Sequence, residues 1–314
     1  MELISLTYPH KLKKESIPNT VAAIGFFDGI HIGHQKVIDQ AKLLAKEQDV
    51  KSAVITFDPH PSVVLKKEKT DVQYLTPLTV KKSLMEQLDV DYLYIIRFDK
   101  TLSQLSPKEF LEHFIVGLNI DHLVAGYDFS FGFKGAGNMS NIQTFIDKPL
   151  AITKVEKISY HDQKVSSTRI RSLLKEGNLE LTEKLLGRPY SVVGEVVRGE
   201  QRGRTIGFPT ANFKITEPYF LPRVGVYAVE VIMENNVFYG MANLGYNPTF
   251  TDQIVDPKLE VNIFDLNQNL YGEILQVNWK SYIRDEVKFS SVEELVEQIR
   301  QDEKNVRHFF SLND

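Results

Sequence analysis

Residues Gly25 to His34 read GFFDGIHIGH and directly follow a short apolar run, Val21 to Ile24. If that run is a strand and a helix opens at Gly33, the N–H groups of the turn and the positive end of the helix face any phosphate bound there. His31 and His34 would then lie beside the phosphate, and two histidines add little apolar burial to a turn. The stretch therefore predicts a phosphate-binding turn that carries chemistry. The alternative is a tight turn whose histidines cap a helix or pack against its side.

The segments around this turn predict a parallel sheet. Between the N-terminus and residue 186, strand-like apolar runs at 21–25, 52–57, 92–98 and 122–125 alternate with helical stretches at 35–48, 80–88 and 107–118. Strands that alternate with helices form βαβ units with right-handed crossovers, which predicts a doubly wound α/β domain. Ligands bind at the carboxyl ends of such strands, so the loops that follow them are expected to form one site.

The second half of the chain has a different pattern. Short alternating runs cover 191–197, 226–233, 236–243, 259–264 and 274–282. They predict an antiparallel sheet or small β-barrel. Ser291 and Glu294 form a capping-box sequence that opens a closing α-helix over 291–310. Gly187 can end the helical segment before it, so we expect two domains, residues 1–186 and 187–314.

Composition restricts the class of protein. The 314 residues are 42% hydrophobic and 25% charged, and no apolar run approaches the roughly 20 residues that a membrane span needs. The charges of the first residues do not fit a secretory signal, so we expect a cytoplasmic protein with no membrane partner. The absence of cysteine excludes disulfides and thiolate chemistry. A net charge of −4 argues against a broad nucleic-acid surface.

Two further loops at the predicted sheet edge carry polar or aromatic side chains. In the sequence TFDPHP, two prolines fix the backbone around Asp58 and His60, which suits either a ligand contact or a local turn. Residues 126–137, GYDFSFGFKGAG, combine glycines that let the backbone approach a ligand with aromatic faces on which a flat ring can stack. Asp128 and Phe129 are the candidates of that loop.

The sequence VSSTRIR, residues 165–171, sets Ser167 and Thr168 at a predicted helix start, with Arg171 one turn later. Hydroxyls and free N–H groups at a helix N-terminus, together with an arginine, suit a polyphosphate. The alternative is a plain capped helix with an arginine that faces solvent. The motif HxGH, His31 to His34, occurs in the same chain, and its presence favours the phosphate interpretation.

These four motifs resemble the HxGH nucleotidyltransferases, in the longer form found in the FMN adenylyltransferase module of bacterial FAD synthetases. The resemblance implies that His31 and His34 stabilise charge on the α-phosphate of ATP while the phosphate of FMN attacks and pyrophosphate leaves. It also implies roles for three groups of residues. These are β- and γ-phosphate contacts from Ser167, Thr168 and Arg171, ATP contacts from Gly25, Phe26 and Asp28, and flavin contacts from Asp58, His60, Asp128 and Phe129. Many relatives carry asparagine at position 128, and an ionised aspartate cannot donate a hydrogen bond as asparagine does.

Residues 198–212 read RGEQRGRTIGFPTAN, a basic loop spaced by glycines. The residues that permit close turns or supply charge are Gly199, Arg202, Gly203, Arg204 and Gly207. Thr210 and Asn212 offer two hard oxygens suited to Mg²⁺. The lysine-hydroxyl ending of a Walker A loop is absent, and the stretch instead resembles the ATP phosphate loop and PTAN motif of riboflavin kinases.

A kinase that phosphorylates a hydroxyl also needs a carboxylate to take the proton. Glu260 in KLEVNIFD is the candidate, on the strand face opposite Leu259 and Val261. That direction in a barrel could be solvent or the mouth of a ligand site. Residues 282–289, YIRDEVKF, resemble the flavin-side loop of the family, with Arg284 and Glu286 as contacts, although a charged run before a helix can also be a solvated cap.

The resemblance implies a bifunctional enzyme that converts riboflavin and ATP to FMN, and FMN and ATP to FAD, each step with Mg²⁺. Two rival functions remain open. One keeps nucleotidyl transfer at HxGH but uses another acceptor, such as a pantetheine or nicotinamide mononucleotide. The other is a flavin-binding regulator without turnover. The oligomeric state is not readable from the sequence.

Overall fold

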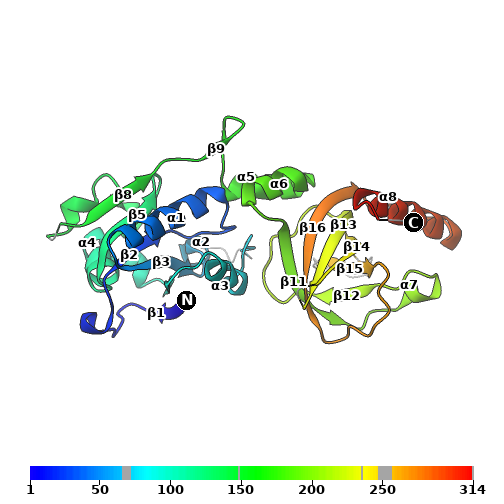
Figure 1. Ribbon diagram of the computed structural model, residues 1–314, viewed down its shortest axis with the longest axis horizontal. Coiled ribbons are helices and arrows are strands. Elements are labelled where there is room, and N and C mark those ends of the chain that lie inside the picture. The colour runs from blue at the N-terminus through cyan, green and yellow to red at the C-terminus, as the bar shows by residue number, and fades with distance from the viewer. Residues whose placement is uncertain (66–71, 148, 235, 247–256, 313–314) are drawn as a thin grey trace. The chain divides into compact units, whose positions relative to one another are not determined.

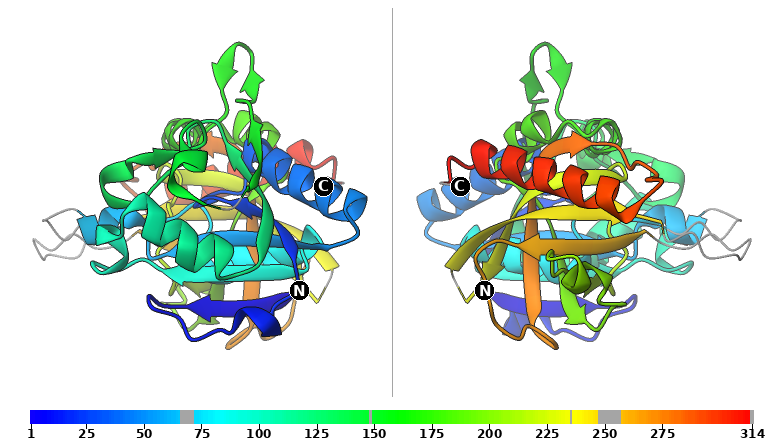
Figure 2. Two further views of the ribbon diagram at one scale, coloured as in Figure 1. Left: turned by 90° about the vertical axis from the view of Figure 1, so that its left-hand side faces the viewer. Right: turned by 90° about the vertical axis from the view of Figure 1, so that its right-hand side faces the viewer.

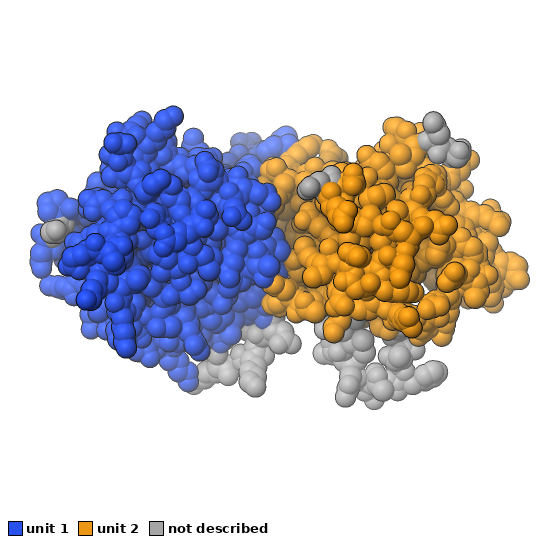
Figure 3. Space-filling view, turned by 60° about the horizontal axis from the view of Figure 1, so that its bottom comes forward, with its two compact units in different colours: residues 1–167 blue, residues 168–314 orange. Residues whose placement is uncertain are grey.

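In the computed structural model of the protein, the chain divides between Ser167 and Thr168 into two units (Figure 3). The structure describes residues 1–65, 72–147, 149–234, 236–246 and 257–312. In the first unit, the strands of the main sheet are β1 (Glu2–Leu6), β2 (Thr20–Ile24), β3 (Lys51–Asp58), β4 (Tyr92–Arg97), β5 (Ile120–Gly126) and β8 (Ala151–Val155). Their order is β1-β4-β3-β2-β5-β8 and every neighbouring pair is parallel, which confirms the predicted parallel sheet. Strands β1 and β8, at the two edges, were not predicted.

Helices lie on both faces of this sheet (Figures 1 and 2). Along β2, Val21 and Ala23 pack in one core with helix α1, whereas Ala22 and Ile24 pack in a second core on the opposite face. The α-helices of this unit are α1 (Ile32–Glu47), α2 (Pro61–Leu65), α3 (Leu78–Gln87) and α4 (Pro107–Leu111). From the central strand β2 the sheet extends to β3 on one side and to β5 on the other. The carboxyl end of β2 is therefore the point at which such sheets bind ligands.

Shorter elements complete the first unit. They are the 3₁₀ turns η1 (Lys14–Ser16), η2 (Leu102–Gln104), η4 (Phe133–Gly135) and η5 (Ile142–Phe145), the π-helical η3 (Glu112–Val116), and the strand pairs β6 (Ser130–Phe131) with β7 (Gly137–Asn138) and β9 (Ser159–Tyr160) with β10 (Gln163–Lys164). Helix α4 and η3 together fill the stretch that was predicted as one helix over 107–118.

The second unit is a closed antiparallel barrel in the order β11-β12-β15-β14-β13-β16, as predicted. Its strands are β11 (Tyr190–Val197), β12 (Ala211–Lys214), β13 (Gly225–Met233), β14 (Asn236–Gly245), β15 (Lys258–Ile263) and β16 (Ile274–Arg284). Its helices are α5 (Ser167–Glu176), which begins at the last residue of the first unit, α6 (Leu179–Leu186), α7 (Arg202–Thr205) and α8 (Val292–Phe309). The short strand β12 was expected to be part of a loop.

Helix α8 closes the barrel as predicted and lies across its outer face (Figure 2). Val306 of α8 packs with Ala228, Met241 and Phe264 of the barrel. The N-cap differs from the expected capping box. The Ser291 hydroxyl does accept a hydrogen bond from the N–H of Glu294, but the Glu294 carboxylate accepts from Ser290 instead of from Ser291.

The division at Ser167 differs from the boundary predicted near Gly187. Gly187 does end helix α6, in the left-handed conformation with φ of 72°. However, α6 contacts β11 and β16, and Lys280 of β16 lies 3.0 Å from Glu183 of α6. These contacts place the helix with the barrel. Within the described residues, none of the helices has both the length and the apolarity required to cross a membrane.

Candidate functional site

The turn after β2 places two histidine rings at the start of α1. His31 is the N-cap of the helix, and its Nδ1 atom accepts a hydrogen bond of 3.2 Å from the backbone N–H of His34. The two rings are stacked, with centroids 3.6 Å apart. Capping and chemistry are therefore compatible interpretations, because the cap itself holds both rings at the positive end of the helix.

The backbone of this turn adopts an unusual conformation. Phe27, Gly29 and Ile30 have φ values of 54°, 89° and 41°, in the left-handed region that is unfavourable for the two non-glycine residues. The buried carboxylate of Asp28 helps to hold it by accepting a hydrogen bond of 3.0 Å from the N–H of Thr76. The Thr76 hydroxyl in turn accepts one of 2.8 Å from the N–H of Gly29. Asp28 thus has a structural role, and its contact with ATP stays a prediction.

The ring of His34 is kept uncharged by its surroundings. Burial lowers the pKa of His34 well below its usual value, and the nearby His31 and Lys81 lower it further. Because Nδ1 of His31 accepts a backbone N–H, the neutral imidazole carries its proton on Nε2. Neutral rings of this kind can donate hydrogen bonds to developing negative charge on a phosphate.

Lys81 is a residue of this site that the sequence analysis missed. It is 3% exposed, and its Nζ atom donates to the carbonyl oxygen of Phe26 at 2.7 Å. The same atom lies 4.1 Å from the centre of the Phe26 ring, whose other neighbour is the edge of the His60 ring. Lys81 and Met85 are the buried residues of α3. A lysine four residues from a methionine on the apolar side of a helix is the signal that could have identified it.

The two prolines around Asp58 and His60 shape the loop after β3. The bond between Asp58 and Pro59 is cis. The Nδ1 atom of His60 accepts a hydrogen bond of 3.1 Å from the N–H of Ser62 and lies 2.7 Å from the hydroxyl of the same residue. His60 thus takes part in a local turn, one of the two possibilities raised for this loop. Flavin contacts of Asp58 and His60 stay predictions.

The glycine- and aromatic-rich loop is held by an ion pair. A carboxylate oxygen of Asp128 lies 2.6 Å from Nζ of Lys164, which also lies over the ring of Tyr127. Hydrogen bonds to Asp128 and Tyr127 raise the pKa of Lys164. The rings of Phe129 and Phe131 are stacked, with centroids 5.9 Å apart, and pack against the core. Asp128 therefore has a cationic partner, and Lys164 is a second residue that the sequence analysis missed.

The SSTxxR motif opens helix α5 as predicted. The Ser167 hydroxyl donates a hydrogen bond of 2.8 Å to the backbone oxygen of Asp28, in the turn that precedes the histidines. Thr168 and Arg171 belong by their contacts to the second unit, where the Arg171 guanidinium lies 5.7 Å from the centre of the Phe220 ring. The phosphate contacts of these three residues stay predictions.

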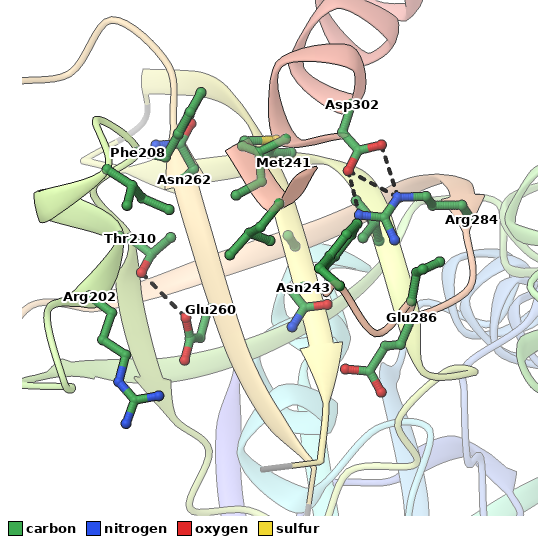
Figure 4. A pocket seen from close by; sticks show the side chains of 18 residues that line it. Arg202, Phe208, Thr210, Met241, Asn243, Glu260, Asn262, Arg284, Glu286 and Asp302 are labelled. Atoms are coloured by element: carbon green, nitrogen blue, oxygen red, sulfur yellow. Dashed lines mark hydrogen bonds and ion pairs between the residues drawn. The ribbon is translucent and has the colours of Figure 1, made fainter. Parts of the chain in front are cut away.

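A cavity of about 350 Å³ opens on the outer face of the barrel, beside helix α8 (Figure 4). Its walls include Arg202, Gly203, Phe208, Thr210, Met241, Glu260, Arg284 and Glu286. Figure 4 shows Arg202, Thr210 and Glu260 on one side and Arg284 with Asp302 on the other. The face of β15 that carries Glu260 therefore points into a cavity and not into bulk solvent.

Two polar contacts fix the PTAN segment against β15. Oγ1 of Thr210 lies 3.4 Å from Oε2 of Glu260, a long hydrogen-bond distance. Nδ2 of the buried Asn262 donates a hydrogen bond of 2.7 Å to the Pro209 carbonyl oxygen. Asn262 was assigned no role from the sequence, and its contact joins residues 53 positions apart.

A second cavity of about 490 Å³ adjoins the first at Thr210, which lines both. It is lined by Gln201, Arg204, Pro209, Val261 and Tyr271, among others. Arg204 thus faces this second space, whereas Arg202 lines the first and forms an ion pair of 2.7 Å with Glu200. Arg202 and Arg204 thus line different cavities.

Each glycine of the basic loop is required for a different structural reason. A Cβ atom on Gly203 would overlap the carbonyl oxygen of Phe208, and one on Gly199 would overlap the side-chain amide of Asn212. Gly207 needs only its backbone freedom, since its φ is 91° and no atom lies within 4 Å of the Cβ position. Asn212 therefore packs directly on Gly199.

Arg284 and Glu286, which were predicted to contact the flavin, have different surroundings. Three hydrogen bonds of 2.6–3.0 Å join the Arg284 guanidinium to the buried carboxylate of Asp302, so most of its donors are already used. Glu286 is exposed, lines the first cavity, and packs on Gly245 where a Cβ atom would lie. The Phe289 ring faces the Arg284 guanidinium, with its centre 6.0 Å away. Arg284 thus holds α8 to the cavity wall.

Comparison with known proteins gives matches over the whole chain. The FAD synthetase family model matches residues 13–169 and the riboflavin kinase model matches residues 186–310. Relatives from Bacillus subtilis and Listeria monocytogenes, both named bifunctional riboflavin kinase/FMN adenylyltransferase, are each 44% identical over 99% of this chain and 99% of their own. A crystal structure described as a macrolide-efflux protein from Streptococcus pneumoniae is 34% identical, covers 97% of this chain and 99% of its own, and has a TM-score of 0.87. The resemblance inferred from the motifs is confirmed, and the chain belongs to the family of bifunctional riboflavin kinases/FMN adenylyltransferases.

Proposed function

We propose that the chain makes FAD in two steps. Residues 187–314 transfer the γ-phosphoryl group of ATP to riboflavin and give FMN, and residues 1–186 transfer the adenylyl group of a second ATP to FMN and give FAD and pyrophosphate. The observation that carries the proposal is the match of two family models, one to each half, in a chain that aligns end to end with enzymes of both activities. Because ATP and flavins are small cytoplasmic metabolites, we place both steps in the cytoplasm.

The kinase step is assigned to the paired cavities. The first cavity has the apolar side chains Phe208, Met241 and Leu295, which suit a flavin ring, and the second has Arg204 for the nucleotide. They meet at Thr210, within 3.4 Å of Glu260. Glu260 is the general base that takes the proton of the riboflavin hydroxyl as its oxygen attacks the γ-phosphorus and ADP leaves.

The residues near Thr210 fit Mg²⁺. This ion usually binds one or two protein carboxylates or other oxygens and fills its remaining positions with phosphate oxygens and water. Thr210 and Asn212 supply such oxygens, and Asn212 is the cross-strand partner of Glu260. Across the residues that the structure describes, no group of three or more His, Asp or Glu side chains forms a denser metal site. When bound, Mg²⁺ neutralises charge on the phosphates.

The adenylyl-transfer step is assigned to the start of α1. His31 and His34 donate to the α-phosphate oxygens while an oxygen of the FMN phosphate attacks the α-phosphorus and pyrophosphate departs. The helix N-terminus and the two imidazole rings act by position and electrostatics, and no covalent nucleophile is required. Ser167, Thr168 and Arg171 bind the departing phosphates.

The test is a product assay with two variants. Purified protein with riboflavin, ATP and Mg²⁺ is expected to form FMN and then FAD, resolved by chromatography. His31→Ala is expected to stop at FMN, and Glu260→Gln is expected to make FAD only when FMN is supplied. No flavin product from the wild type would exclude the enzyme and leave a flavin-binding regulator. Equal damage to both steps by either variant in a folded protein would contradict the assignment of one site to each unit.

A further inference from the structure

The buried cation Lys81, on helix α3, contacts the HxGH turn, residues 25–34. Lys81 is 3% exposed, and its Nζ atom donates to the Phe26 carbonyl oxygen at 2.7 Å and to the Thr56 hydroxyl at 3.3 Å. The Thr56 hydroxyl donates to the same carbonyl at 3.0 Å. A buried lysine is unusual in a core unless its charge is compensated, so this arrangement needs an explanation.

We propose that Lys81 is a positioning residue for adenylyl transfer, whose ammonium group fixes the backbone of the turn that presents His31 and His34. The inference rests on the proposed function, because it assigns a role in the FAD-forming step. Lys81 donates hydrogen bonds to the Phe26 carbonyl oxygen and the Thr56 hydroxyl and is not a catalytic residue itself.

The geometry of the turn explains why such an anchor is needed. Between the Phe26 carbonyl and His31, the residues Phe27, Gly29 and Ile30 all have positive φ. A backbone of this kind persists only where its surroundings hold it. The Phe26 carbonyl is the point where the chain leaves the sheet, and Lys81 and Thr56 occupy both of its lone pairs.

The other restraints on the turn come from the same place. The N–H and hydroxyl of Thr76, just before α3, bind Asp28 and Gly29. Lys81 lies in the second turn of that helix, so the segment from Thr76 to Lys81 is joined to the HxGH turn at both ends. Loss of the Lys81 anchor is therefore expected to loosen the turn at its exit from β2.

The charge of Lys81 also acts on the histidines. The groups that face it are Asp28 of the turn, Asp58 at the end of β3 and His34 of α1. Burial lowers the pKa of Lys81 to about 8, while the two aspartates oppose that shift. Lys81 is thus charged at neutral pH, and its charge lowers the pKa of His34 and helps to keep that ring neutral.

The experiment compares Lys81→Met, which removes the charge and the donors, with Lys81→Arg, which keeps both. Lys82→Met is the matched control, because Lys82 is the next residue of the same helix and is only half-buried. FAD formation from FMN and ATP is measured on the full chain. FMN formation by the same samples reports that the second unit is folded, and amide hydrogen exchange of the buried strand β3 reports that the first unit is folded. We expect Lys81→Met to lower kcat of FAD formation on the order of 10–100-fold, since misplaced catalytic groups have effects of that size. Lys81→Arg is expected to retain most of the activity, and Lys82→Met all of it.

Two further measurements separate positioning from general destabilisation. The wild-type rate of FAD formation is expected to fall above pH 8, where Lys81 loses its proton, and in Lys81→Arg this fall is expected to move to higher pH. Amide hydrogen exchange of residues 25–34 is expected to quicken in Lys81→Met and not in Lys82→Met. If the wild type made no FAD, the proposed function would fail, whereas unchanged exchange and unchanged kcat in Lys81→Met would overturn the role of Lys81.

Discussion

The side-chain amide of Asn262 donates a 2.7 Å hydrogen bond to the Pro209 carbonyl oxygen, and it thereby ties the PTAN segment to the strand that carries Glu260. Thr210 follows Pro209 directly and lies 3.4 Å from Glu260. The relative position of the proposed Mg²⁺ ligand and the proposed general base thus depends on one buried amide.

Asn262→Ala is expected to remove this tie and lower kcat of FMN formation about tenfold or more, because the loop is no longer held at Glu260. The free energy of unfolding of the barrel is expected to fall by about 0.5–1.5 kcal/mol, the usual net contribution of one intramolecular hydrogen bond. Trp279, the single tryptophan, is buried in the barrel, so urea unfolding followed by its fluorescence reports this unit. Asn305→Ala, on the exposed side of α8, is the control. Normal FMN formation by Asn262→Ala would contradict the role of the amide.

Arg284→Met is expected to destabilise the barrel by about 3–5 kcal/mol, because it leaves the carboxylate of Asp302 buried without its cation. The double variant Arg284→Met/Asp302→Leu is expected to recover much of that loss, since the unpaired charge is gone. Tryptophan fluorescence during urea unfolding measures both. If the single variant were as stable as the wild type, the ion pair would not hold α8.

Gly199→Ala and Gly207→Ala form a matched pair in the basic loop. The new methyl group at 199 overlaps the Asn212 amide, so this variant is expected to lose most FMN formation. The one at 207 meets open space and is expected to cost about 1–2 kcal/mol of backbone strain with nearly normal kcat. FAD formation from supplied FMN is the internal control. Equal losses of kcat at both positions would argue against a role for Asn212.

The stability of the first unit is expected to fall as the pH drops below about 6.5, the usual pKa of histidine. His34 has a lowered pKa in the folded state, so between that value and 6.5 the unfolded chain binds more protons and acid favours unfolding. His34→Gln is expected to remove part of this dependence. Hydrogen exchange of residues 20–47 at pH 7 and pH 5 measures it. An identical change in protection for wild type and variant would contradict the assignment to His34.

A truncated chain of residues 168–314 is expected to be more stable than one of residues 187–314. Helix α6 buries Leu185 and Leu186 completely, at roughly 1.5–3 kcal/mol each, and Glu183 pairs with Lys280 of the barrel. Urea unfolding followed by Trp279 compares the two. Equal stability of the two truncated chains would support the domain boundary at Gly187 that the sequence analysis predicted.

The fold could be predicted because its signals are local. Strand and helix periods alternate through the first half, and the barrel strands β11, β13, β14 and β16 were expected within one or two residues of most of their ends. Strand β12 was missed because its four residues follow a proline within a motif that reads as a loop. The contact of α6 with the barrel was not predicted, because Lys280 lies 97 residues from Glu183.

At the candidate sites, the sequence analysis proposed the motif residues and did not identify the residues that hold these motifs in place. Each of the motifs GFFDGIHIGH and PTAN is one continuous stretch of sequence, so its chemistry can be inferred from that stretch alone. Lys81 and Asn262 act through bonds to residues 55 and 53 positions away, and a local pattern shows at most that Lys81 lies on the apolar side of its helix. The conformation of the turn was not predicted either, because two of its three positive-φ residues are Phe27 and Ile30 and not glycine.

Thr210 forms part of the wall of two cavities at once, and this has a consequence for inhibitor design. A single compound with an aromatic head in the first cavity and a nucleoside-like head in the second would need a linker that passes the Thr210 side chain. Such a bisubstrate compound gains the binding free energy of both heads and loses translational and rotational entropy only once. The length and polarity of its linker would be set by the side chains of Thr210 and Glu260, whose oxygens lie 3.4 Å apart.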